Sequence, residues 1–96
     1  MESDERNRLI RGIATARSWV EALVKGSVAD IAELARLENR TPRSIRMTLS
    51  LAFLDPALVE AACAGTLPRG YGVTRFMDLP PIFANQWQAL GLSRPI

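Results

Sequence analysis

The sequence predicts an all-α domain of five to six helices, with a central helix-turn-helix between a long N-terminal helix and a C-terminal helical extension. Three observations predict this class. Apolar residues recur at helical spacing, proline follows a helix-capping residue at two places, and no strand pattern occurs. The 96 residues are 48% hydrophobic and 23% charged, as expected for one globular unit with a modest core. Residues 1–96 are therefore expected to form a single domain.

The first helix is expected from about Asp4 to Val24. Ser3 is a candidate N-cap, and Gly26 follows the helix as a stop signal. The core-facing stripe recurs at intervals of four and three residues and comprises Leu9, Ile13, Ala16, Val20 and Leu23.

Two shorter helices follow and form a helix-turn-helix over about residues 30–52. The first runs from Asp30 to Glu38, with Glu33 completing a capping-box-like pair. Asn39 is expected in the left-handed conformation, which asparagine tolerates better than most residues. The second helix runs from Thr41 to Ala52, with Thr41 as its cap and Pro42 at its first position.

The rest of the chain repeats these signals. Asp55-Pro56 begins a fourth helix that Gly65 ends, and residues 66–72 form a loop. A short helical stretch is expected at Val73–Met77, and Pro80-Pro81 opens a last helix that Gly91 stops. The expected core includes Cys63 and the large aromatic residues Trp19, Phe53, Phe76, Phe83 and Trp87.

The composition argues against an enzyme. There is no histidine and one cysteine, which excludes Ser–His–Asp and Cys–His nucleophiles and zinc sites of the His and Cys kind. No serine has an adjacent base to activate it, and the carboxylates are scattered or used as caps. We expect no catalytic site, metal, cofactor or small-molecule substrate. The charged N-terminus and the lack of a long apolar run predict no membrane segment and a cytoplasmic location.

Positive charge is concentrated in the helix-turn-helix. Residues 36–53 carry a net +3, whereas residues 1–35 carry −1 and residues 54–96 carry 0. If Ile45 and Leu49 are buried, helical geometry turns the opposite face outward. Side chains on that face could reach base edges in the major groove of double-stranded DNA, where arginine bonds guanine and methionine contacts a thymine methyl. The candidate base-reading residues are Arg43, Arg46, Met47 and Ser50, and the candidate backbone contacts are Arg40, Thr41 and Ser44.

Other interpretations stay open. The arginine face could be a solvated face of a helical bundle, or it could meet an acidic protein partner. The turn also departs from the usual pattern, because Arg40 stands at a position that is commonly apolar. The long first helix could serve a homodimer that reads two half-sites, although packing within the domain explains its stripe equally well and is preferred.

The segment from Val28 to Ala61 resembles the C-terminal region of bacterial, phage-like serine recombinases of the resolvase/invertase family, whose helix-turn-helix type also occurs in plasmid-partition proteins. The likeness covers about Arg17 to Leu92, and its motifs are Leu51-Ala-Phe-Leu-x-Pro, Val59-Glu-Ala, Gly65-x-Leu-Pro, then Pro80, Gln86 and Leu90-Gly91. The chain departs from the pattern in the turn and at Phe83, where tryptophan is expected.

The resemblance implies a non-catalytic DNA-binding module, because the catalytic serine of that family lies in a separate N-terminal domain. The resemblance implies that the chain is either part of a larger recombinase or a free-standing relative of its DNA-binding region. A free-standing dimeric transcriptional regulator is the alternative.

Overall fold

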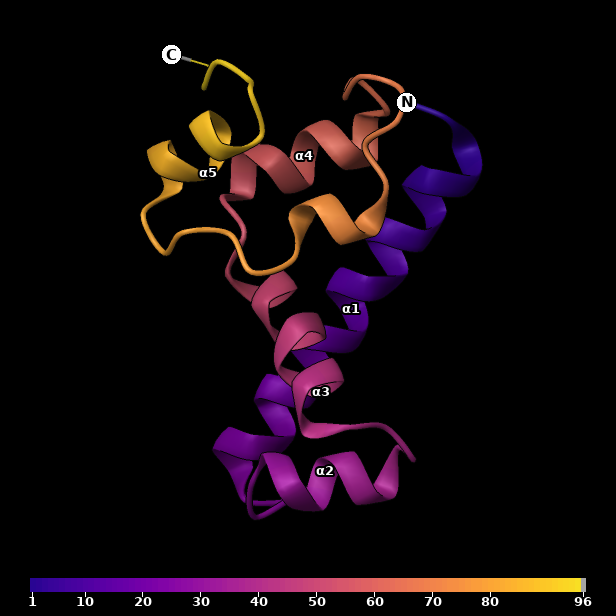
Figure 1. Ribbon diagram of the computed structural model, residues 1–96, viewed down its shortest axis with the longest axis vertical. Coiled ribbons are helices and arrows are strands. Elements are labelled where there is room, and N and C mark those ends of the chain that lie inside the picture. The colour runs from indigo at the N-terminus through magenta and orange to yellow at the C-terminus, as the bar shows by residue number, and fades with distance from the viewer. Residues whose placement is uncertain (96) are drawn as a thin grey trace.

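The computed structural model describes residues 1–95, and its all-helical architecture confirms the predicted fold class. The α-helices are α1 (Ser3–Lys25), α2 (Ile31–Leu37), α3 (Pro42–Leu49), α4 (Pro56–Ala64) and α5 (Phe83–Ala89). Two 3₁₀ helices, η1 (Ser50–Phe53) and η2 (Val73–Phe76), complete the described part of the chain, which contains no strand. Helix α1 runs along the molecule, with α2 and α3 beside its C-terminal half and α4 and η2 beside its N-terminal half, while α5 lies at the same end of the molecule but farther from α1 (Figure 1).

Helix α1 extends about one residue beyond the predicted range at each end. Its predicted cap is wrong: Ser3 is the first helical residue, and Glu2 occupies the cap position without a side-chain hydrogen bond. Gly26 ends the helix as predicted, with φ 78°, and its N–H bonds back to the last turn.

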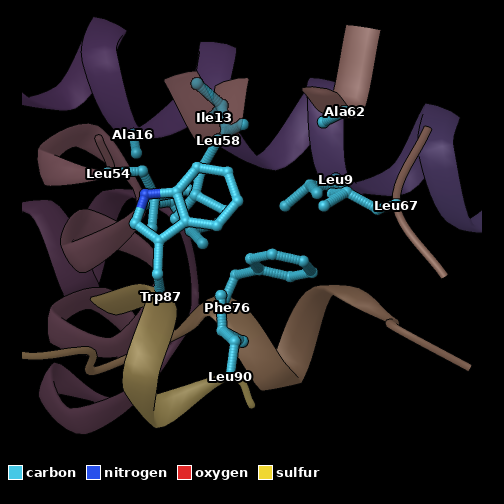
Figure 2. Close-up of a cluster of buried hydrophobic side chains, with 11 residues drawn as sticks. Leu9, Ile13, Ala16, Leu54, Leu58, Ala62, Leu67, Phe76, Trp87 and Leu90 are labelled. Carbon is cyan, nitrogen blue, oxygen red and sulfur yellow. The ribbon is translucent and has the colours of Figure 1, made fainter. Parts of the chain in front are cut away.

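Two buried clusters share α1. The larger one lies between the N-terminal half of α1 and the C-terminal elements, with Phe76 and Trp87 as its largest members (Figure 2). It comprises Leu9, Ile13, Ala16, Leu51, Leu54, Leu58, Ala62, Leu67, Phe76, Trp87 and Leu90. The smaller cluster joins α1 to α2 and α3 and comprises Trp19, Leu34, Ala35, Ile45 and Leu49. The helix-turn-helix therefore has a core of its own, and α1 fixes it to the rest of the domain.

A buried polar hub attaches α5 to the start of α4. Asp55 caps α4 by accepting from the Ala57 amide at 3.0 Å, and it also accepts from Trp87 Nε1 at 2.8 Å. The side chain of Gln86 accepts from the Asp55 amide at 2.8 Å and donates to the Phe53 carbonyl at 2.9 Å. Because Asp55 and Gln86 are both 2% exposed, these bonds satisfy groups that would otherwise be costly to bury.

Three expected core residues, Phe53, Cys63 and Phe83, are exposed, which corrects the prediction. Leu51 and Leu54, three residues apart in and after a 3₁₀ helix, take the inward positions, and Phe53 is left 59% exposed. Leu37 lies about 200° round the helix from the buried Ala35 and is 57% exposed. Cys63 is exposed beside the buried Ala62, since neighbouring helical residues point about 100° apart.

Phe83 is also exposed. It is the first residue of α5 and belongs to neither buried cluster. The last helix was predicted to open at Pro80-Pro81, but it begins two residues later, after Ile82 in the cap position.

Candidate nucleic-acid interface

The helix-turn-helix forms as its capping residues predict. Asp30 accepts from the Glu33 amide at 2.8 Å and begins α2. Asn39 has φ 53°, and this left-handed turn lets the Arg40 amide bond the Ala35 carbonyl at 2.9 Å. Ala35 is buried in the small cluster that α2 and α3 share with α1, as expected for a residue at a close helix crossing.

Helix α3 presents its arginines outward. Ile45, Thr48 and Leu49 are buried on its inner side, while Arg43 and Arg46 are exposed and Met47 is half-buried. Among residues 1–95, no carboxylate oxygen lies within 4.0 Å of either guanidinium. Two charged groups one helical turn apart are thus left without an ion pair.

Arg40 is engaged within the fold. Its guanidinium stacks over the Trp19 ring, 5.4 Å from the ring centroid. Its Nε donates to Ser44 Oγ at 2.8 Å, and its Nη2 donates to the Thr48 hydroxyl at 3.0 Å. Arg40 therefore clamps the turn to α1 and α3, which explains how an arginine occupies a turn position that is commonly apolar. Arg40 stays exposed, and its Nη1 has no hydrogen-bond partner among residues 1–95, so this group remains for an outside acceptor.

The start of α3 offers fewer free donors than a typical helix end. Thr41 caps the helix by accepting from the Ser44 amide at 3.1 Å, and the Ile45 amide bonds the Thr41 carbonyl. Pro42 has no N–H, so a phosphate here would meet the Arg43 amide and the Thr41 hydroxyl.

Ser50 lies outside the α-helix that was expected to carry it. Helix α3 ends at Leu49 and tightens into η1, instead of continuing to Ala52. The Ser50 hydroxyl donates to the Met47 carbonyl and accepts from the Asp78 amide at 2.8 Å. Both bonds are internal, so the main role of Ser50 is to anchor the segment after η2 to the end of α3.

That anchor brings Asp78 to the arginine face. A hollow of about 250 Å³ is lined by Arg43, Arg46, Met47 and Asp78. Asp78 has φ 56°, a left-handed conformation that aspartate tolerates better than most residues. Sequence reasoning missed Asp78, because its neighbours lie about 30 residues earlier and no local pattern reports such a contact.

Other kinds of site find little support. Over the described range no group of three or more His, Cys, Asp and Glu side chains could hold a metal ion. A second hollow, of about 140 Å³, lies between α1 and α4 and is mostly apolar. No single helix within residues 1–95 is long and apolar enough to cross a membrane; residues Pro42–Phe53 and Pro56–Ala64 reach that length only together, across a 91° bend.

The residues that carry the recombinase resemblance lie mostly in the polar hub and the larger cluster. Leu51 and Leu54 are buried in that cluster, and Gln86 bonds the backbone next to Pro56. These motifs therefore describe a packing framework in the part of the domain next to the helix-turn-helix. Comparison of the chain with protein-family models, curated proteins and solved structures finds no match.

Proposed function

We propose that this domain binds double-stranded DNA through the outer face of α3. The observation that carries the proposal is the pair of exposed guanidinium groups of Arg43 and Arg46, which have no ion pair in the described structure. Their helix is held by a buried core on its other side, so the two groups project from a rigid element. Such groups suit phosphate oxygens and the O6 and N7 acceptors of guanine.

The candidate residues have different roles in this proposal, some in direct contact with DNA and some indirect. Arg43, Arg46 and Met47 face base edges. Thr41 and the free Nη1 of Arg40 contact the phosphate backbone. Ser44 and Ser50 act indirectly, since the first accepts from Arg40 and the second anchors the segment that carries Asp78.

The finer proposal is that the domain is the non-catalytic DNA-binding part, or a relative, of a serine site-specific recombinase. The support is the order of the motifs from Leu51 to Gly91, whose buried residues pack next to the helix-turn-helix. A free-standing regulator that binds as a dimer is the rival within the DNA-binding class. A palindromic target bound by two copies would favour the regulator.

The test is equilibrium binding to a random-sequence duplex, followed by fluorescence anisotropy at about 50 mM and about 200 mM salt. Wild-type protein is expected to bind at low salt and to lose affinity steeply as salt rises, since phosphate contacts release counterions. Arg43→Ala/Arg46→Ala should weaken binding much more than Arg8→Ala/Arg11→Ala, a pair of exposed arginines on the far half of α1 that removes the same charge.

Two results would contradict the proposal. If folded wild-type protein does not bind DNA at low salt, the arginine face belongs to a protein contact with an acidic partner. If both double variants lose affinity equally, binding reflects overall charge and not the α3 face.

A further inference from the structure

We infer that Asp78 is a specificity-determining residue of the α3 face, selecting a G·C base pair together with Arg43 or Arg46. The inference rests on the proposed DNA binding and adds a residue from outside the helix-turn-helix. The inference starts from the hollow that Arg43, Arg46, Met47 and Asp78 line. Its volume of about 250 Å³ is far larger than the ~10–15 Å³ that one water molecule needs.

The position of Asp78 is fixed by backbone contacts. Its amide donates to Ser50 Oγ, and Ser50 in turn donates to the Met47 carbonyl, so a two-bond bridge holds residue 78 against the end of α3. Asp78 is exposed, and its carboxylate oxygens lie farther than 4.0 Å from the guanidinium nitrogens of Arg43 and Arg46. The hollow is therefore lined by hydrogen-bond donors from α3 and by one charged acceptor from the segment after η2.

That arrangement matches the major-groove edge of a G·C pair. Guanine presents the acceptors N7 and O6, which an arginine can bond in two-pronged fashion, and cytosine presents the N4 amino donor, which a carboxylate can accept. Guanine O6 and cytosine N4 are adjacent, since they are hydrogen-bonded to each other in the pair. An A·T pair instead presents an amino donor between two acceptors, which does not match two donors beside one acceptor.

A phosphate fits the hollow less well. The carboxylate repels phosphate oxygens, so Asp78 weakens binding to the DNA backbone at the same place where it favours one base pair. Lower non-specific affinity and higher discrimination are the two measurable consequences.

Two substitutions separate these effects without disturbing the bridge, which uses only the backbone of residue 78. Asp78→Asn removes the charge but keeps an acceptor oxygen, and Asp78→Gly removes both. Asparagine and glycine both tolerate φ near 56°, so neither strains the turn. Glu60→Gln, at an exposed acid of α4, is the charge-matched control.

The experiment selects duplexes from a random pool with wild-type protein and each variant, and sequences the bound fraction. Wild-type and Glu60→Gln protein should enrich G·C at one position, and Asp78→Gly should lose about tenfold in discrimination there. Asp78→Asn should keep part of the preference. Both Asp78 variants should bind a random-sequence duplex several-fold more tightly than wild type, and by more than Glu60→Gln does.

The outcomes separate this inference from the proposed function. If Asp78→Gly enriches the same base pairs as wild type, the role of Asp78 is wrong while DNA binding stands. If wild-type protein binds DNA but enriches no sequence, the inference fails in the same way. If wild-type protein binds no DNA at low salt, the proposed function itself is overturned, and the inference falls with it.

Discussion

Replacing Asp55 by asparagine tests the buried polar hub that attaches α5 to the start of α4. The carboxylate is 2% exposed and accepts three hydrogen bonds, from the Ala57 amide, Trp87 Nε1 and Arg94 Nε. Asparagine can keep the capping bond to Ala57 through its oxygen, but its amino group then faces two other donors. A hydrogen bond to a charged group contributes about 1.5–3 kcal/mol, and the bond to the half-exposed Arg94 contributes less. We expect Asp55→Asn to lower the free energy of unfolding by about 2–4 kcal/mol.

The effect should depend on pH. Burial acts to raise the pKa of Asp55, but the hydrogen bonds from Trp87 and Ala57 and the charge of Arg94 outweigh it, so the folded-state pKa lies below the ordinary value of 3.8. The unfolded chain therefore takes up this proton first as the pH falls. The ionised carboxylate stabilises the fold fully above about pH 5, and the contribution is lost as the pH falls through the folded-state pKa.

The assay is urea unfolding followed by circular dichroism, from about pH 2.5 to pH 7, for wild-type and Asp55→Asn protein. The difference between them should be largest near neutral pH and should shrink below about pH 4. Glu60→Gln, at an exposed acid of the same helix, should change stability by less than about 0.5 kcal/mol. An Asp55→Asn variant as stable as wild type, or a difference that does not change with pH, would refute the role assigned to the hub.

Substitutions at three positions test the helix-turn-helix, each by urea unfolding. Ile45→Ala should lower the free energy of unfolding by about 2–5 kcal/mol, because Ile45 is fully buried in the smaller cluster; a loss below 1 kcal/mol would mean that this cluster does not hold α3. Arg40→Gln should cost about 1–2 kcal/mol, since it removes the stacking on Trp19 and the bond to the buried Thr48, and an unchanged stability would refute the clamp. Asn39→Ala should cost about 1 kcal/mol and Asn39→Gly should cost nothing, because only the alanine is strained at φ 53°; equal effects would contradict the left-handed turn.

The sequence predicted the helices well because their signals are local. The caps Asp30, Thr41 and Asp55 each make the expected hydrogen bond to an amide two or three residues on. Gly26 ends the first helix as predicted, and Asn39 adopts the predicted left-handed conformation. These features depend on residues a few positions apart, which is the range over which a single sequence is informative.

The errors arise where distant segments meet. Helix α3 was predicted to continue to Ala52, but tightening at Ser50 lets Leu51 enter the larger cluster beneath α1. The same change lets the Ser50 hydroxyl accept a hydrogen bond from the Asp78 amide, 28 residues later in the sequence. Arg40 was expected to face phosphate, and its partners Trp19 and Thr48 could not be identified from spacing. The candidate face was therefore found from charge and periodicity, while its supporting contacts needed the structure.

The most direct test of the central claim is a titration of ¹⁵N-labelled protein with a short DNA duplex, followed by NMR. We predict that the amide signals of Arg43, Arg46 and Met47 move most, that those of the turn move with them, and that the N-terminal half of α1 is unaffected. A folded protein whose signals do not move at low salt, or whose shifts lie on α1 or α4 and leave α3 unchanged, would contradict DNA binding by this face.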